Sequence, residues 1–201
     1  LVVSGQVHER VRLEAGADGR VTVVTPDTDA AAGDLVLDTA VPGFANAHSH
    51  AFHRALRGRT HDGGGDFWSW REKMYRTAAA LTPARYAVLA RAVFAEMVTA
   101  GFTAVGEFHY VHHRPGGQPY GSGPDAGPEP PHAMERAVAE AAEAVGIRLT
   151  LLDTAYLAGG VGRPLAPEQA RFGDADAEAY LRRWHALAGV PSANTRCLVS
   201  I

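Results

Sequence analysis

The chain has 201 residues, with 19 Lys and Arg against 22 Asp and Glu and a formal net charge of −3. Hydrophobic residues make up 46% and charged residues 20%, the composition of an ordinary globular protein that can bury a sizeable core. These numbers exclude a basic nucleic-acid-binding domain, a collagen-like chain and a small disulfide-stapled domain. No apolar run reaches the roughly 18 residues of a membrane span, so we expect neither nucleic acid nor membrane among the partners.

The chain contains one cysteine, Cys197. A single cysteine makes no internal disulfide, so we expect a reducing compartment and a cytoplasmic protein. The first residues lack a basic segment followed by a long apolar run, and we therefore expect no signal peptide. The chain begins with Leu1 instead of Met, and we expect that its front is trimmed.

Residues 1–40 predict a small antiparallel β-unit with little apolar mass. Residues 7–13 alternate loosely between polar and apolar side chains, and residues 21–24 are β-branched and follow an Asp-Gly turn signal. Residues 35–37 are apolar and follow a second turn. We expect a strand in each of these three ranges, and we expect the unit to pack on something larger.

From residue 41 the chain alternates between strand and helix patterns. Strands are predicted over residues 41–48, 102–108, 147–152 and 196–201. Helices are predicted from Pro83 to just before Gly101, over residues 134–145 and over residues 175–187. The first of these strands is expected to be buried. This alternation favours a parallel sheet with right-handed crossovers, either doubly wound or closed as a barrel.

Two irregular stretches interrupt the alternation. Residues 62–66 form a glycine-rich loop, and an aromatic cluster follows at residues 67–71. Of the 18 residues from 114 to 131, five are Gly and six are Pro. This composition predicts a long irregular loop at the functional end of a strand.

Five of the ten histidines follow two of the predicted strands: His48, His50, His109, His112 and His113. Parallel sheets carry their chemistry at the carboxyl ends of the strands. His48 and His50 stand two residues apart on an extended backbone and therefore point to the same side. Their imidazoles can converge on one metal ion, and neutral imidazole suits Zn²⁺ or Fe²⁺. Such a pair alone is weak evidence, but its place after an apolar strand strengthens it.

Residues 41–50 resemble the first barrel strand of the amidohydrolase superfamily. Members of that superfamily are (β/α)8 metal-dependent hydrolases with a small β-sandwich assembled from both ends of the chain. Residues 67–76 and 106–113 both resemble the formimidoylglutamate deiminases within it, and these two segments are more specific than the histidine pair. The resemblance extends from about residue 41 to about residue 187.

The resemblance implies an α/β fold, with an incomplete (β/α)8 TIM barrel preceded by part of a β-sandwich. Residues 1–40 would be the N-terminal part of the sandwich, and residues 41–201 the first half of the barrel, because a complete barrel takes about 250 residues. The implied reaction is zinc-dependent hydrolysis of N-formimidoyl-L-glutamate to N-formyl-L-glutamate and ammonia, a step of histidine degradation. The remaining metal ligands and the acid–base residues would lie beyond residue 201, so we expect no significant catalysis from the chain as given.

The resemblance also implies roles for five residues. His48 and His50 would be metal ligands, with zinc expected and iron as the alternative. Arg71 would bind a carboxylate of the glutamyl group, and Tyr110 would donate its hydroxyl to a substrate carboxylate. His53 would also face the substrate, at a position where many relatives carry Gln. A histidine can still donate a hydrogen bond there, but it can also titrate.

Several alternatives stay open. His109, His112 and His113 either support a loop, which is the favoured interpretation, or form a second metal site. Glu107 is either catalytic or a hydrogen-bonded structural residue. The whole protein is alternatively another amidohydrolase deaminase, acting on a cyclic amidine such as a purine or a triazine. It is otherwise a truncated, non-catalytic protein that binds a metal or a partner. The oligomeric state also stays open, with a homo-oligomer as one alternative.

Overall fold

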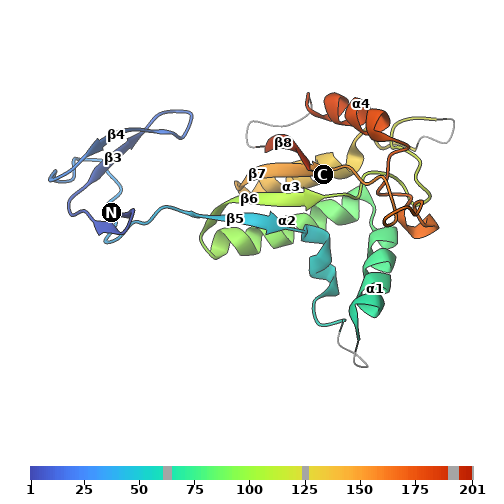
Figure 1. The fold of residues 1–201 in the computed structure, drawn as a ribbon. Coiled ribbons are helices and arrows are strands. Elements are labelled where there is room, and N and C mark those ends of the chain that lie inside the picture. Colours follow the sequence, from blue (N-terminus) through green and yellow to red (C-terminus); the bar gives the residue numbers. More distant parts are fainter. Residues whose placement is uncertain (61–64, 124–126, 190–194, 201) are drawn as a thin grey trace. The chain divides into compact units, whose positions relative to one another are not determined.

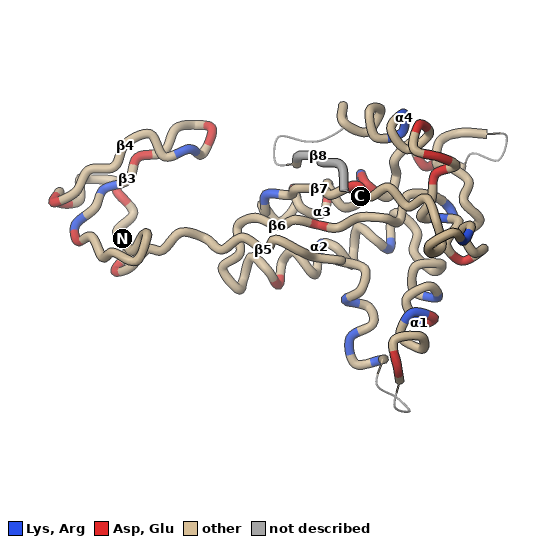
Figure 2. The backbone as a smooth tube through the Cα atoms, in the orientation of Figure 1, with Lys and Arg blue, Asp and Glu red and all other residues tan. Residues whose placement is uncertain are grey.

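A computed structural model describes residues 1–60, 65–123, 127–189 and 195–200 of the chain. It contains two compact units, Leu1–Gly43 and Phe44–Ile201. Both signs of charge are interspersed along the chain (Figure 2). Within the described ranges, none of the helices has the length and hydropathy needed to cross a bilayer. Most of the predicted glycine-rich loop, and the middle of the predicted Pro/Gly-rich loop, lie outside these ranges.

The smaller unit consists of two short antiparallel ladders (Figure 1). The paired strands are β1 (Val2–Val3) with β2 (Gln6–Val7), and β3 (Arg12–Ala15) with β4 (Val21–Thr25). Gly19 lies in the turn between β3 and β4 with φ of 73°, a conformation that glycine adopts without a steric penalty. The predicted antiparallel β-unit is therefore present, and its second predicted strand is confirmed as β4.

Two strand predictions in this unit are wrong. The predicted strand over residues 7–13 is broken, because Arg10 adopts a positive φ of 46° and bends the backbone between β2 and β3. Residues 35–37 form no strand, and their side chains are 62% to 85% exposed. Apolar residues favour a strand only where a neighbouring strand and a packed face support it, and no strand of this unit pairs with residues 35–37.

The larger unit is built on a sheet in which each neighbouring pair of strands is parallel. Its strands are β5 (Phe44–Ser49), β6 (Phe102–His109), β7 (Arg148–Thr154) and β8 (Thr195–Ser200). Their spatial order, β5-β6-β7-β8, is also their order along the chain. Successive barrel strands follow this order, whereas a doubly wound sheet reverses its order at a switch point. The predicted parallel α/β sheet is confirmed, and its strand order resembles that of successive strands in a (β/α)8 barrel.

Helices α2 and α3 lie together on one face of this sheet (Figure 1). Helix α2 (Pro83–Thr99) begins where the sequence predicts, because the Thr82 hydroxyl accepts a hydrogen bond from the Arg85 backbone N–H at 3.2 Å. Pro83 occupies the first helical position, where its missing N–H costs nothing. Gly101 follows the helix with φ of 89° and turns the chain into β6.

The next two predicted helices are also confirmed. Helix α3 (Ala133–Val145) ends at Gly146, which has φ of 79° and donates its backbone N–H to the last turn. Helix α4 (Ala177–Leu187) begins after Asp176, whose carboxylate accepts from the Ala179 backbone N–H at 2.7 Å. Local capping chemistry therefore sets the end of α3 and the start of α4.

Helix α1 (Phe67–Ala80) is absent from the sequence prediction, which describes its first turn only as an aromatic cluster. Aromatic side chains are mediocre helix formers, so residues 67–71 carry no strong helical signal. The helix begins at Asp66, whose carboxylate accepts from the Ser69 backbone N–H at 2.9 Å. Because residues three apart share a helix face, Trp68 and Arg71 lie next to each other.

The prediction that the first strand is buried is wrong. Strand β5 is an edge strand in the described sheet, where it pairs with β6 alone. Phe44 at its start is 58% exposed. A sequence pattern shows that a strand is apolar, but not how many neighbours cover it.

The core lies between the sheet and its helices. Its fully buried members include Tyr86, Phe94, Met134, Val138 and Ile147. Strand side chains alternate between the two faces of a sheet. Accordingly Val105, Glu107 and His109 of β6 are 2%, 0% and 1% exposed and belong to the helix side, whereas Phe108 belongs to the other side. This alternation separates the predicted site histidines into two groups.

Candidate functional site

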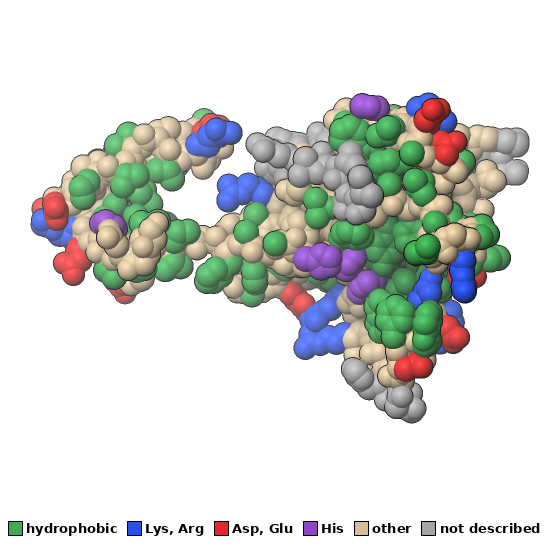
Figure 3. Space-filling view, in the orientation of Figure 1, with side chains coloured by type: hydrophobic (Ala, Val, Ile, Leu, Met, Phe, Trp, Pro, Cys, Tyr) green, Lys and Arg blue, Asp and Glu red, His purple; other side chains and the backbone are tan. Residues whose placement is uncertain are grey.

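The first group of histidines lies at the carboxyl end of β5. The rings of His48 and His50 lie with their centroids 4.7 Å apart, and histidine side chains form a patch on the surface of the larger unit (Figure 3). The Nδ1 atom of His50 lies 3.0 Å from the Phe108 carbonyl oxygen. A carbonyl oxygen only accepts, so Nδ1 carries the proton and Nε2 keeps its lone pair. This arrangement orients a histidine for binding a metal ion.

The charge state of His50 also fits a metal ligand. Burial and the neighbouring His48 lower the pKa of His50 below its ordinary value, and they outweigh the hydrogen bond to Phe108, which raises it. The imidazole is therefore neutral at pH 7, which is the form that binds a divalent metal. The two side chains supply nitrogen ligands of the kind that Zn²⁺ and Fe²⁺ accept.

His53 and Tyr110 form a hydrogen-bonded pair beside these histidines. The Nε2 atom of His53 lies 2.9 Å from the Tyr110 hydroxyl oxygen, and the ring centroids of His50 and His53 are 4.5 Å apart. Burial, then His50 and His48, lower the pKa of His53 to about 4. Burial raises the pKa of Tyr110. Both side chains are therefore neutral at pH 7. One hydrogen atom occupies the bond between His53 Nε2 and the Tyr110 hydroxyl oxygen.

Arg71 lies in a separate cavity of about 300 Å³. Its guanidinium carbon is 5.7 Å from the centroid of the Trp68 ring and 5.2 Å from that of Tyr75. The Nε–H group donates to the Tyr75 hydroxyl at 2.6 Å. Two neighbouring rings and the hydrogen bond at Nε hold the guanidinium in place.

Aromatic side chains lie between this cavity and the pair His48 and His50. We call them the aromatic wall: Trp70, Tyr75, Tyr110 and Tyr156. Trp70 lies 5.4 Å from His53, and Tyr110 lies 6.2 Å from Tyr156, between ring centroids. The Tyr156 hydroxyl in turn shares a hydrogen-bond partner, Gln169, with Tyr75. The structure thus brings His48, His50, His53 and Tyr110 together and places Arg71 at the far end of the same wall.

Tyr156 and Gln169 are absent from the predicted site, although both border it. Tyr156 stands two residues after the end of β7, just as Tyr110 stands one residue after β6. Position relative to the strand ends would have identified Tyr156. Gln169 ends a short 3-10 segment between β7 and α4, and no sequence signal marks it.

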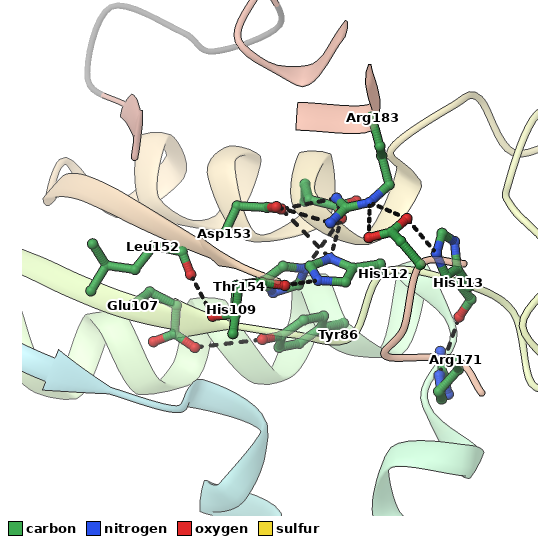
Figure 4. A network of polar contacts seen from close by, with 12 residues as sticks. Tyr86, Glu107, His109, His112, His113, Leu152, Asp153, Thr154, Arg171 and Arg183 are labelled. Carbon is green, nitrogen blue, oxygen red and sulfur yellow. Dashed lines mark hydrogen bonds and ion pairs between the residues drawn. The ribbon is translucent and has the colours of Figure 1, made fainter. Parts of the chain in front are cut away.

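The second group of histidines lies on the helix side of the sheet (Figure 4). His109, His112 and Glu135 offer ligand atoms that all lie within 4.8 Å of one another, a spacing compatible with a bound metal ion. In the structure His112 is already bonded at both ring nitrogens. Its Nδ1 atom lies 2.8 Å from Glu135 Oε1, and its Nε2 atom lies 3.0 Å from the Thr154 carbonyl oxygen.

Arg183 turns this group into a buried ion-pair cluster. It binds Asp153 through two nitrogens at 3.0 and 3.1 Å, contacts Asp174 at 3.1 Å and lies 3.4 Å from Glu135. Burial alone would raise the pKa of Asp174, but hydrogen bonds from His113 and Arg183 lower it to about 2. The Arg183 guanidinium already pairs with the carboxylates of this cluster. This favours the structural interpretation of the cluster over a metal site.

Glu107 also has structural contacts. Its Oε1 atom accepts a hydrogen bond from the Ala51 backbone N–H at 2.6 Å, directly after His50. Burial raises the pKa of the Glu107 carboxyl group. The side chain thus fixes the chain at the start of the short 3-10 helix Ala51–Leu56, and these contacts favour the structural interpretation of Glu107.

Comparisons with known proteins agree with this geometry. Residues 39–191 match the Amidohydrolase family, so the chain belongs to the amidohydrolase family, as its sequence motifs predict. Enzymes of this family are metal-dependent hydrolases. The chain is 41% identical over 175 residues to formimidoylglutamate deiminase of Pseudomonas aeruginosa, covering 85% of this chain and 37% of that protein.

Two further relatives are informative. The crystal structure of an amidohydrolase from Brucella melitensis superimposes with a TM-score of 0.82 at 34% identity, covering 96% of this chain and 42% of that one. A 5-methylthioadenosine/S-adenosylhomocysteine deaminase of Natronomonas pharaonis is 35% identical over 98 residues, which cover 47% of this chain and 22% of that protein. The chain therefore spans well under half the length of the relatives that it matches.

Replacement of Arg183 by Met is expected to destabilise the folded protein by about 3–5 kcal/mol, because Asp153 would stay fully buried without its partner. Urea denaturation followed by circular dichroism measures the change. Arg182→Met is the matched control, because its ion pair with Glu178 is 71% and 88% exposed and its loss should cost less than about 1 kcal/mol. Equal losses in the free energy of unfolding for the two variants would contradict a stabilising role of the buried ion-pair cluster.

The low pKa of His53 predicts a pH dependence of stability. The unfolded chain binds a proton near pH 6.5 and the folded chain only near pH 4, so this group's contribution is fully present above pH 6.5. It is lost as the pH falls from 6.5 through 4. We expect His53→Gln to reduce the drop in Tm between pH 7 and pH 5, measured by calorimetry. His8→Gln, at an exposed position, should leave that drop unchanged; an unchanged drop in both variants would refute the prediction.

Proposed function

We propose that the protein is a metal-dependent deiminase that hydrolyses N-formimidoyl-L-glutamate to N-formyl-L-glutamate and ammonia, in cytoplasmic histidine degradation. One observation carries the proposal: the pair His48 and His50, two adjacent imidazoles, shares an aromatic wall with a guanidinium suited to a carboxylate. The 41% identity to a formimidoylglutamate deiminase supports it. In the reaction, water adds oxygen to the formimidoyl carbon and the imino nitrogen leaves as ammonia.

His48 and His50 would hold the metal, with zinc as the expected ion and iron as the alternative. When bound, such an ion supplies a water of lowered pKa and stabilises developing negative charge. The Nδ1–H bond from His50 to Phe108 keeps the His50 ring turned so that Nε2 faces away from the sheet backbone.

Arg71 would bind one carboxylate of the substrate. A guanidinium meets a carboxylate through two parallel hydrogen bonds, and the rings of Trp68 and Tyr75 exclude part of the water that would compete. The contact fixes the glutamyl group, and the aromatic wall leads from there to the histidine pair.

Tyr110 would donate its hydroxyl proton to a substrate carboxylate. This requires that the hydroxyl oxygen accept its bond from His53, with the His53 proton on Nε2. The low pKa of His53 keeps the ring in a neutral form that supplies this one proton. His53 would thus orient Tyr110 at the substrate without adding a charge.

The domain assignment belongs to the same proposal. Residues 1–40 would be part of a β-sandwich, and residues 41–201 part of an incomplete (β/α)8 barrel. The remaining metal ligands and the acid–base residues would come from later strands of a longer protein, in keeping with the 37% of the deiminase that the chain covers.

A second candidate is a deaminase that acts on a cyclic amidine. The similarity to 5-methylthioadenosine/S-adenosylhomocysteine deaminase favours it, although that similarity covers only 47% of the chain. Arg71 distinguishes N-formimidoyl-L-glutamate from a neutral heterocycle such as 5-methylthioadenosine, because the neutral heterocycle presents no carboxylate for it to bind.

The direct test supplies the full-length, zinc-loaded protein with N-formimidoyl-L-glutamate, 5-methylthioadenosine and an aminotriazine in separate assays. We expect ammonia release from the first substrate alone, measured with a glutamate dehydrogenase coupled assay. Release from only a heterocycle would favour the second candidate. A protein that binds zinc and releases no ammonia from N-formimidoyl-L-glutamate would overturn the proposal.

Replacement of Arg71 by Met should lower kcat/KM for N-formimidoyl-L-glutamate by about 100-fold, because a charge-assisted carboxylate contact of about 3 kcal/mol is lost. Steady-state kinetics on the full-length enzyme measures the change. Arg76→Met is the matched control, on the same helix but exposed, and should change kcat/KM less than about twofold. Equal effects at both positions would contradict the role of Arg71.

A further inference from the structure

Gln169 is a buried side chain beside the cavity that contains Arg71. It is 1% exposed and ends the short 3-10 segment η2 (Pro167–Gln169), between β7 and α4. Its Oε1 atom accepts from the Ala166 backbone N–H at 2.8 Å. Because a backbone N–H only donates, this bond fixes which way the amide points.

The amide nitrogen of Gln169 then donates to two phenols. Its Nε2 atom lies 3.0 Å from the Tyr75 hydroxyl and 3.0 Å from the Tyr156 hydroxyl. Both amide hydrogens and the amide oxygen are therefore engaged. This one side chain joins helix α1, the end of β7 and the segment before α4.

Tyr75 transmits this constraint to Arg71. Its hydroxyl oxygen accepts from Gln169 on one side and from Arg71 Nε at 2.6 Å on the other. A free arginine side chain samples many rotamers, and holding its Nε atom removes much of that freedom before a ligand arrives. The direction of the guanidinium thus depends on where Gln169 holds the Tyr75 hydroxyl.

The chain around Gln169 is closely packed. A Cβ atom on Gly159 would lie 2.8 Å from Gln169 Oε1 and 2.5 Å from the Pro164 carbonyl oxygen, so only glycine fits there. The Gly159 backbone N–H also donates to the Arg163 carbonyl oxygen at 3.0 Å. The segment that contains Gly159 therefore packs closely against the Gln169 amide and restricts its position.

We propose that Gln169 is a positioning residue, which acts through Tyr75 to orient the Arg71 guanidinium for a carboxylate of the substrate. The inference rests on the proposed function in one respect, that Arg71 binds a substrate carboxylate. Gln169 does not touch the histidine pair, so its loss should weaken substrate binding and leave the chemical step largely intact.

The first test is kinetic and uses the full-length enzyme with N-formimidoyl-L-glutamate. Gln169→Leu keeps the side-chain size and removes the three hydrogen bonds, and it should raise KM about tenfold with kcat within about twofold. Gln118→Leu, at an exposed glutamine, should change neither constant. A loss confined to kcat would overturn the proposal.

A double-mutant cycle separates positioning from a purely structural role. In the Arg71→Met background there is no guanidinium left to orient, so Gln169→Leu should cost nothing further in kcat/KM. A tenfold loss in both backgrounds would overturn the proposal. If Gln169→Leu does not fold, Tyr75→Phe takes its place, because it removes the hydroxyl and keeps the ring; the same lack of additivity with Arg71→Met is expected.

Hydrogen exchange at Arg71, measured without substrate, tests the positioning role of Gln169 independently of the proposed function. The ¹⁵N–¹H signal of Arg71 Nε–H, assigned by its loss in Arg71→Met, should exchange slowly in the parent and at least tenfold faster in Gln169→Leu. Equal exchange rates would overturn the positioning role. If the parent releases no ammonia from N-formimidoyl-L-glutamate, the proposed function fails, and the exchange rates still decide whether Gln169 fixes Arg71.

Discussion

Strand β6 pairs with β5 on one side and β7 on the other, and its alternating side chains divide the molecule into two chemical regions. Glu107 and His109 point into the helix layer, whereas the Phe108 carbonyl oxygen fixes His50. Tyr110, just after the strand, faces the same histidines. A shift of one residue in this pairing would exchange the two sets and dismantle both regions.

The two regions treat charge in opposite ways. On the helix side, Arg183 balances Asp153 and Asp174, and the cluster ties α4 to the ends of the strands. On the other side, burial keeps His50 and His53 uncharged. This separation matters because an uncompensated carboxylate near His50 would raise the pKa of His50. The proton held on the ring would then compete with a metal ion for the ring nitrogen. The sheet between the regions keeps these demands apart.

Local sequence signals predict many of the helix and strand bounds. Thr82 before Pro83, and Gly146 after a periodic helix, mark helix ends by capping chemistry that needs no tertiary context. The errors come from context that a single sequence does not display. Residues 35–37 have the composition of a strand and no partner, and β5 is apolar and lies at an edge. Helix α1 carries no strong sequence signal because its first turn is aromatic, and packing rather than propensity supports it.

The site was predictable where spacing carries the information. The closeness of the His48 and His50 rings follows from their spacing of two residues, and their segment is one of three that carry the family resemblance. The proposed roles of Arg71, Tyr110 and His53 remain predictions. Gln169 was not predictable, because its importance comes from three hydrogen bonds made across distant parts of the chain.

The surroundings of His53 have a consequence for how such chains are identified. The family resemblance implies Gln at this position in many relatives, and a pKa of about 4 makes His53 behave at neutral pH as a side chain with one N–H donor and no charge. An imidazole so placed substitutes for an amide. A search that demands the amide would discard chains in which burial, rather than residue identity, preserves the chemistry.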